Sequence, residues 1–348
     1  MGGCFPRGDL LCVRVVSLLI GLCALPAVWM TARTLWPESR WRPAVTLAVF
    51  AGLPMTPYMT AMLNNSTLAM TLISLIVWLC AHLAMGASDR RTWLGLGACL
   101  GLLLLTKVTG SWTLVLIGLT GYIAIRKTPR DAARATMVNA LLSAGLVVLI
   151  AGPWLARNQA VYGTMLPERV SDRRGNEGGF IGFLAYPEDA WMAFTAGWKQ
   201  TLATLYMPYW LIQPYARELW LREAAMVLAA LTAAGLAVGV ARKAVARKTG
   251  AWGRRDAYMA SVVAAMGVAG VMVVYMSVRD YLIVVSGGRY LWEGVSAASV
   301  LGCAGLTAYR RRWVCGAISV SVIAGLVYLS VRSWGVVTWL AATHPPEL

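Results

Sequence analysis

The chain alternates long apolar runs with short charged clusters over most of its length. A bilayer core of about 30 Å requires roughly 20 apolar residues per helix, so runs near this length predict transmembrane helices. Ten candidate spans result: Leu11–Ala32, Pro43–Met62, Thr67–Gly86, Trp93–Thr106, Thr109–Ile125, Thr136–Leu155, Ala224–Ala241, Met259–Val278, Tyr290–Tyr309 and Trp313–Val331. The fourth and fifth are short and meet at Lys107, which fits two tilted helices or a broken hairpin. The pattern predicts an all-α, polytopic transmembrane helical bundle.

A long connection divides the predicted spans into two groups. Residues 1–155 hold six spans and residues 224–348 hold four, while residues 156–223 form a loop of 68 residues. Loops of this length usually carry function or an additional element. Apolar residues at steps of three and four predict a helix lying flat on the membrane interface within this loop: Trp191, Phe194, Trp198, Leu202 and Leu205.

Two features of this loop have alternative interpretations. Its aromatic residues fit an interfacial belt or a platform on which a sugar ring stacks. The polar, glycine-rich stretch from Ser171 to Gly179 fits a mobile lid or a simple connection.

Composition supports membrane insertion. The 348 residues are 59% hydrophobic and only 13% charged, with a mean hydropathy of +0.63, which excludes an ordinary soluble domain. The formal net charge of +16 could indicate nucleic-acid binding. However, the basic residues lie in short clusters between spans rather than on one solvated face, so no nucleic-acid partner is expected.

The distribution of Lys and Arg predicts the orientation. One set of alternate loops carries 18 of these residues: 33–42, 87–92, 126–135, 242–258 and 310–312. The other set carries 12, of which seven lie in the long loop 156–223. Because short cytoplasmic loops are enriched in Lys and Arg, the first set is predicted to be cytoplasmic. Both termini and the long loop are then predicted to face outward.

Cysteine and histidine give no sign of a metal centre. The seven cysteines lie mostly inside apolar runs, without CxxC pairs and without ligand-like spacing to the two histidines. We expect small buried apolar side chains, with no disulfide, metal or cofactor.

Cations are predicted at three helix ends on the outer side. Lys107 ends the fourth span, Arg157 with Asn158 follows the sixth, and Arg289 with Tyr290 begins the ninth. An anion entering a region of low dielectric must be paired, so converging cations favour a site for a lipid phosphate. Lys107 could instead extend independently toward the headgroups.

Four segments resemble signatures of the GT-C membrane glycosyltransferases, of the dolichyl-phosphate-mannose-protein mannosyltransferase-like branch or a related uncharacterised bacterial polytopic family. In chain order they are LPMTPYMTAMLNNSTLAM (Leu53 to Met70), TKVTGSWTLVLIG (Thr106 to Gly118), GPWLARNQAVYGTMLP (Gly152 to Pro167) and GGRYLWEGVSAAS (Gly287 to Ser299). The resemblance covers about 250 residues in family order.

The resemblance implies transfer of a sugar from a polyprenyl-phosphate donor to a glycan, lipid or protein acceptor at the outer face. It places Lys107, Arg157 and Arg289 at the family's basic positions, where they would stabilise charge on the departing phosphate. It also implies that this chain starts after the family's first helix and first outer loop, which carries the catalytic acid.

The chain departs from the family at two positions. Ser66 stands where relatives have Asp after two asparagines, and Glu293 stands where they usually have Pro. We therefore assign no catalytic residue. An outer acid could substitute, with Glu168, Asp172, Glu177 and Asp280 as the options, or the enzyme is truncated or inactive. The alternatives are a non-catalytic protein that binds polyprenyl-phosphate lipids or supports assembly, and a transporter of lipids or solutes.

Overall fold

The computed structural model describes residues 7–53, 56, 60, 65–127, 129–163, 165, 235, 253–279, 294–308 and 312–343. Within these ranges every regular element is helical and no strand occurs, which confirms the all-α prediction. The elements are α1 (Arg7–Leu22), α2 (Ala24–Leu35), α3 (Arg42–Gly52), α5 (Asn65–Met85), α6 (Arg90–Thr106), the 3-10 helix η1 (Val108–Trp112), α7 (Thr113–Arg126), α8 (Arg130–Tyr162), α13 (Arg254–Arg279), α15 (Val295–Leu306) and α16 (Arg312–Thr343).

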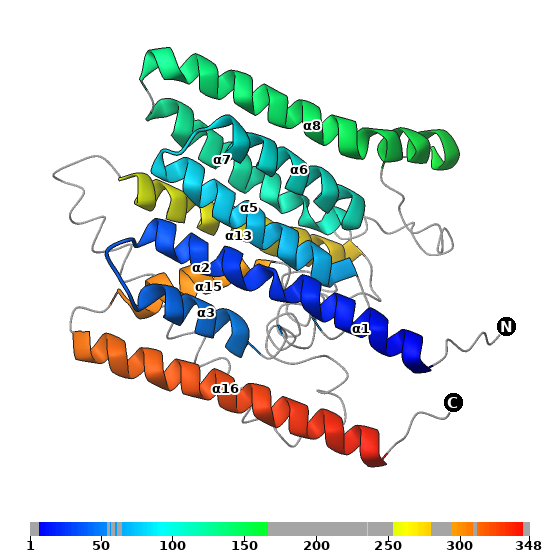
Figure 1. The fold of residues 1–348 in the computed structure, drawn as a ribbon, viewed down its shortest axis with the longest axis vertical. Coiled ribbons are helices and arrows are strands. Elements are labelled where there is room, and N and C mark those ends of the chain that lie inside the picture. The colour runs from blue at the N-terminus through cyan, green and yellow to red at the C-terminus, as the bar shows by residue number, and fades with distance from the viewer. Residues whose placement is uncertain are drawn as a thin grey trace, which may run out of the picture.

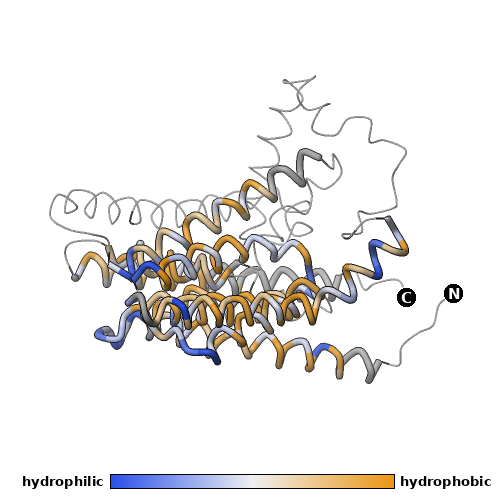
Figure 2. Tube along the Cα trace, turned by 90° about the horizontal axis from the view of Figure 1, so that it is seen from above, coloured by the Kyte–Doolittle hydropathy of each residue, from blue (hydrophilic) through white to orange (hydrophobic). Residues whose placement is uncertain are grey.

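The helices lie side by side with roughly parallel axes, with α8 at one edge of the array and α16 at the other (Figure 1). The start of α1 and the end of α16 lie at the same end (Figure 1). Hydrophobic residues fill the middle of the helices, and hydrophilic residues gather toward their ends (Figure 2). This is the distribution expected for helices that cross a bilayer.

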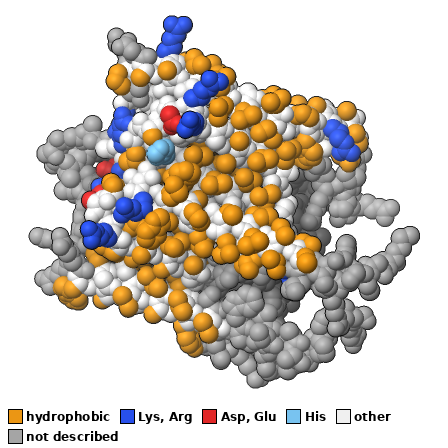
Figure 3. Space-filling view, viewed as in Figure 1, with side chains coloured by type: hydrophobic (Ala, Val, Ile, Leu, Met, Phe, Trp, Pro, Cys, Tyr) orange, Lys and Arg blue, Asp and Glu red, His pale blue; other side chains and the backbone are white. Residues whose placement is uncertain are grey.

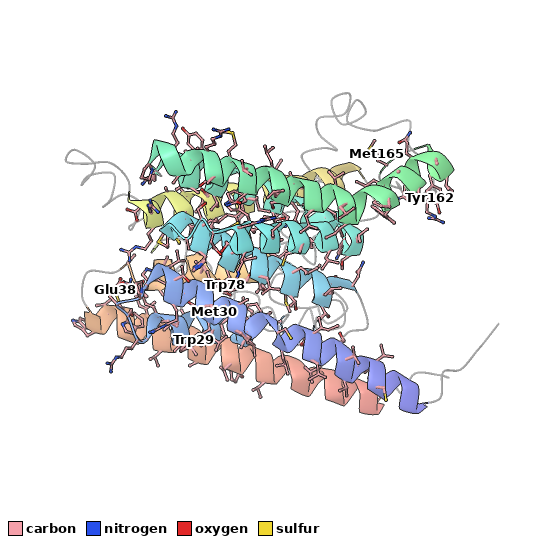
Figure 4. The ribbon with its side chains drawn as sticks, turned by 45° about the horizontal axis from the view of Figure 1, so that its top comes forward. Trp29, Met30, Glu38, Trp78, Tyr162 and Met165 are labelled. Atoms are coloured by element: carbon pink, nitrogen blue, oxygen red, sulfur yellow. The ribbon has the colours of Figure 1, made fainter. Side chains whose placement is uncertain are left out.

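Four helical stretches are long and apolar enough to cross a membrane by length and composition: Cys12–Leu35, Asn65–Met85, Val108–Arg126 and Ala132–Tyr162. Large hydrophobic side chains remain exposed along them, including Leu141 at 67% and Leu149 at 71% on α8. A space-filling view shows such side chains covering the middle of one face (Figure 3), and Trp29 and Met30 of α2 are further examples (Figure 4). These features support membrane association, while the number of ten spans stays a prediction.

The described parts of the basic loops that were predicted to be cytoplasmic meet at one end of the bundle, which we call the basic end. It comprises the turns between α2 and α3, α5 and α6, and α7 and α8, together with the start of α13 (Figure 1). Its described cations are Arg33, Arg40, Arg42, Arg90, Arg91, Arg126, Lys127, Arg134, Arg254 and Arg255. The other end, which we call the opposite end, holds Lys107 and the end of α8.

Contacts across the basic end join helices that are distant in sequence. Arg254 Nη2 donates to the carbonyl oxygen of Lys127 at 2.8 Å, which ties α13 to the end of α7. Tyr258 is fully buried and its hydroxyl donates to the carbonyl oxygen of Val77 at 2.8 Å, which ties α13 to α5. The order of the helices at this end is therefore set by hydrogen bonds as well as by apolar packing.

Helices α6 and α8 pack closely through glycine. A Cβ added at Gly97 would lie 2.5 Å from the backbone oxygen of Ser143, and one at Gly101 would lie 2.9 Å from Ile150 Cβ. The two glycines are four residues apart, the spacing at which small residues allow membrane helices to approach. The order of the contacts also shows that α6 and α8 run in the same direction.

The helix that contains the sixth predicted span extends beyond the predicted end of that span. The sequence placed the end of the span at Leu155, but α8 continues without a break to Tyr162. Gly163 then ends the helix in the left-handed conformation, with φ of 71°, and its N–H donates to the carbonyl oxygen of Gln159. Arg157 and Asn158 therefore belong to the last turns of a helix rather than to a loop.

Two helices are too short to cross a membrane alone. Helix α3 has 11 residues and α15 has 12, so their lengths are about 16 Å and 18 Å. Both have one end near the basic end, where Cys303 Sγ of α15 donates to the carbonyl oxygen of Arg42 at 3.5 Å. Phe50 and Val295, near their other ends, belong to one buried cluster. The C-terminus of α3 and the N-terminus of α15 therefore lie deep within the bundle.

Candidate functional site

Lys107 occupies the sharp reversal between α6 and η1. Its backbone is extended, with φ of −164° and ψ of 113°, so α6 stops after Thr106. The reversal is antiparallel, because an added Cβ at Gly110 would meet Leu103 while one at Gly121 would meet Trp93. Lys107 therefore separates two helices, which agrees with one of the two interpretations of the sequence.

The ammonium group of Lys107 points to the first turn of α5. Lys107 Nζ donates to Ser66 Oγ at 2.8 Å, and Ser66 is only 4% exposed. A second contact joins the same two segments, because Asn65 Nδ2 donates to the carbonyl oxygen of Thr106 at 2.9 Å. Two segments that carried the family resemblance, 41 residues apart, thus meet at one place.

Further hydroxyl groups attach α1 to the first turns of α5. Ser17 Oγ donates to Thr67 Oγ1 at 3.2 Å, and Thr71 Oγ1 donates to the carbonyl oxygen of Ile20 at 2.9 Å. Both contacts involve residues of α5 that follow Ser66 within the first two turns of the helix. These hydrogen bonds fix the position of the first turns of α5 next to the ammonium group of Lys107.

The electrostatics of this arrangement favour an anion. The N-terminus of a helix carries the positive end of the macrodipole and several N–H groups without partners inside the helix. The ammonium group of Lys107 adds a second positive charge there, and both charges attract an anion. The junction of Lys107 with Ser66 is therefore suited to receive a phosphate or carboxylate.

Arg157 lies at the same end of the bundle as Lys107. Helices α6 and α8 are parallel, and the glycine contacts pair Gly97 with Ser143 and Gly101 with Ile150. Continuing this register brings the end of α6 to the level of the turn that holds Arg157. Arg157 is exposed, so its guanidinium is accessible.

Asn158 has a structural contact. It is 2% exposed, and its Nδ2 donates to the carbonyl oxygen of Met165 at 3.3 Å. Gln159 Nε2 also donates to the carbonyl oxygen of Gly163 at 3.1 Å. These bonds fold the chain back over the end of α8, where Tyr162 and Met165 lie (Figure 4). A role of Asn158 in ligand binding stays a prediction.

Several predicted features lie outside the described residues. They are the site residues Arg289 and Tyr290, the interfacial helix around Trp191 to Leu205, the stretch 171–179, and the span 224–241 apart from Gly235. The convergence of three cations stays a prediction, with two of the three now located at one end of the bundle.

Two buried polar groups near the Lys107 reversal and at the start of α15 were not predicted from the sequence. Trp112 Nε1 and Ser296 Oγ are buried and have no hydrogen-bond partner in the structure. Trp112 ends η1, five residues after Lys107, and Ser296 lies in the first turn of α15. Both lie inside segments that carry the family resemblance, Thr106 to Gly118 and Gly287 to Ser299, but the sequence does not show that their polar atoms are buried and unpaired.

Comparisons of the chain with models of protein families, with curated proteins and with solved structures gave no match. The function is therefore argued from the geometry of the site and from the motifs in the sequence.

Proposed function

We propose that the protein is a multi-pass membrane protein of the cell envelope that binds a polyprenyl-phosphate-linked sugar at the outer face of the membrane. Its activity would be that of a GT-C-type glycosyltransferase. The observation that carries the proposal is the contact of Lys107 Nζ with Ser66 Oγ at the N-terminus of α5. It supports a phosphate site because a lysine and a helix N-terminus attract the same anion.

The position of the site fits a lipid ligand. Helix α6 has 17 residues, so Lys107 lies about 25 Å from the basic end, near the far side of a bilayer core of about 30 Å. A phosphate at this depth keeps contact with the headgroup region while its polyprenyl chain remains in the hydrocarbon core. Arg157 supplies a second cation at the same end, and an exposed guanidinium can bind phosphate bidentately.

The same positive charge would assist sugar transfer. In that reaction the bond between the anomeric carbon and the phosphate oxygen breaks, and its electron pair stays on the phosphate. The acceptor oxygen forms the new bond to the anomeric carbon, and its proton passes to a base. Lys107 would stabilise the negative charge that develops on the departing phosphate.

A non-catalytic lipid-binding function is the second candidate, and Ser66 favours it. Ser66 is a neutral hydroxyl at the position where the resemblance implies a carboxylate. A protein with this change retains the cation that binds the phosphate but lacks an acid at that place. Binding and transfer therefore need separate measurements.

The test uses the purified full chain in lipid nanodiscs. Binding of polyprenyl phosphate is measured for the wild type, for Lys107→Ala and for Lys127→Ala, a matched lysine at the basic end. We expect Lys107→Ala to weaken binding about ten-fold or more, as expected for a charge-assisted contact, and Lys127→Ala to leave it unchanged. Equal affinities for all three proteins would refute the phosphate site. Transfer of the sugar to an added acceptor then separates the enzyme from the binding protein.

A further inference from the structure

Helix α15 begins inside the bundle rather than at a membrane surface. Its 12 residues extend about 18 Å from the basic end, which is little more than half of a bilayer core of about 30 Å. The first N–H groups of a helix have no partner within that helix. Such a helix end is tolerated at membrane depth only where protein or a polar ligand meets it, and in transporters half-helix N-termini bind substrates.

Trp112 faces this helix end directly. A Cβ added at Gly294, the residue before α15, would lie 3.1 Å from Trp112 Cζ2 and 2.9 Å from Met266 Sδ. Cζ2 adjoins the ring carbon that is bonded to Nε1, so the edge of the indole that carries the N–H lies against the start of α15. A side chain at residue 294 would require the Met266 side chain to move and the indole to shift slightly.

Two buried polar groups without a hydrogen-bond partner lie at the start of α15, one on the indole that adjoins Gly294 and one in the first turn of the helix. Trp112 is 3% exposed and its Nε1 has no hydrogen-bond partner; Ser296 is 1% exposed and its Oγ also has none. Buried donors are nearly always paired, and leaving one unpaired in a region of low dielectric is costly. Two such groups beside one buried helix N-terminus therefore indicate an acceptor that is supplied by another molecule.

The residues indicate an uncharged, oxygen-rich acceptor. The unpaired groups here are an indole N–H and a hydroxyl. Apart from its chain neighbours, the atoms nearest to a Cβ built at Gly294 belong to Trp112 and Met266, which are both uncharged. Hydroxyl and ring oxygens of a sugar accept hydrogen bonds from such donors, and an indole provides a flat apolar surface for a sugar ring. This chemistry differs from that of Lys107, whose side chain is a cation and attracts anions.

The distance between the two places fits one ligand. Helix η1 connects them, with Lys107 before its first residue and Trp112 at its end. At about 2.0 Å per residue, its five residues span about 10 Å. This is comparable to the length of a phosphate with one attached sugar ring.

We propose that Trp112, Ser296 and the N-terminus of α15 form a subsite for the sugar ring of a lipid-linked sugar phosphate whose phosphate binds at Lys107. The inference rests on the proposed function, because it assigns the sugar end of the same ligand. The sugar lies deeper in the bundle than the phosphate, and Trp112 Nε1 donates to one of its oxygens.

The test compares ligands with and without the sugar. Affinities of the full chain in nanodiscs are measured for polyprenyl phosphate and for polyprenyl phosphates that carry mannose, glucose or arabinose. Trp112→Phe removes the N–H but keeps an aromatic ring, and Ser296→Ala removes the hydroxyl. Ser319→Ala is the matched control, because Ser319 is also a buried serine with an unpaired Oγ but lies on α16.

We expect the wild type to bind at least one sugar-bearing lipid about ten-fold more tightly than plain polyprenyl phosphate. Trp112→Phe and Ser296→Ala should each reduce this ratio by a factor of about three to ten and leave the affinity for plain polyprenyl phosphate unchanged. Ser319→Ala should preserve the ratio. Lys107→Ala should weaken the binding of plain and of sugar-bearing polyprenyl phosphate by the same factor.

Different results overturn different statements. A wild type that binds plain polyprenyl phosphate through Lys107 but prefers no sugar-bearing lipid overturns the subsite and leaves the phosphate site standing. The subsite is also overturned if Trp112→Phe and Ser296→Ala leave the ratio of the affinities for sugar-bearing and plain polyprenyl phosphate unchanged. This holds whatever the thermal stability of the two variants. If no lipid depends on Lys107, the proposed function fails with it.

Discussion

Arg255 Nη1 lies 3.0 Å from Glu38 Oε1, although 217 residues separate the two along the chain. Arg255 lies in the first turn of α13, and Glu38 lies in the turn between α2 and α3 (Figure 4). Arg255 also donates to the carbonyl oxygen of Leu35 at 3.3 Å, and Arg42 lies 4.0 Å from the same carboxylate. One carboxylate thus connects the N-terminal and C-terminal parts of the bundle among several cations.

The Glu38 contact predicts a pH dependence of stability. A hydrogen bond from its own backbone N–H, and then the contacts with Arg255 and Arg42, hold the pKa of the Glu38 carboxyl below its ordinary value of 4.5. A lowered pKa in the folded state means that the stabilisation is complete above pH 4.5 and is lost as the pH falls through the folded-state pKa. Glu38 is largely exposed, so the contribution is below about 1 kcal/mol.

Glu38→Gln should therefore lower the melting temperature slightly at pH 7, and the difference from the wild type should shrink as the pH falls through the lowered folded-state pKa of Glu38. Thermal unfolding of both proteins over a series of acidic pH values measures this. A difference that persists unchanged at the lower pH would show that packing rather than charge is responsible.

The close contact of α6 with α8 predicts sensitivity to small substitutions. Gly97→Ala places a methyl group 2.5 Å from a backbone oxygen of Ser143, which cannot move aside as a side chain can. We expect a loss of stability of about 1–3 kcal/mol, measured by thermal unfolding in nanodiscs. Gly145→Ala on α8 is the control, because an added Cβ there meets nothing within 4 Å. Equal melting temperatures for the two variants would contradict the packing.

The position of Ser66 predicts that an acidic residue there weakens phosphate binding. Ser66→Asp would pair directly with Lys107 and compete with the ligand for its ammonium group. We expect polyprenyl phosphate to bind about ten-fold more weakly. Ser39→Asp adds the same charge at the basic end, where Ser39 Oγ already accepts a hydrogen bond from the N–H of Arg42, and should not affect binding. Unaltered binding by Ser66→Asp would mean that the phosphate does not depend on Lys107.

The concentration of cations at the basic end predicts its location in the cytoplasm. In a background without cysteine, Gly253→Cys should resist an impermeant maleimide added to intact cells, whereas Tyr162→Cys should react. Gly253 and Tyr162 are both exposed and lie at opposite ends of the bundle, so each serves as the control for the other. The reverse labelling pattern would invert the orientation and place the Lys107 site inside the cell.

The apolar runs located most of the described helices, because burial in lipid requires continuous hydrophobicity that is visible in any single sequence. Helix ends were less predictable. Arg157 was taken to mark the end of a span, but charged residues can occupy helical turns beyond the hydrocarbon core, and the signal that ends α8 is Gly163.

The half-length helices could not be predicted at all. The apolar composition around α3 and α15 is the same whether a helix crosses the bilayer or stops within it, and the break depends on tertiary contacts such as that of Gly294 with Trp112. The candidate site was likewise predicted only in part. Lys107 was identified as a costly ion at a helix end, but its contact with Ser66 joins residues 41 positions apart and follows from the fold alone.

The depth of the α15 N-terminus has a consequence for how binding responds to conditions. Peptide dipoles, an indole N–H and a serine hydroxyl do not change charge over the physiological pH range, and they are shielded from mobile ions inside the bundle. A ligand bound at Trp112 and Ser296 would therefore be attracted equally at all acidities and ionic strengths, whereas a phosphate bound at exposed Arg157 would be attracted less as salt rises. In a cell envelope where pH and salt concentration vary, such a site would keep its preference for one ligand over another even when its overall affinity changes.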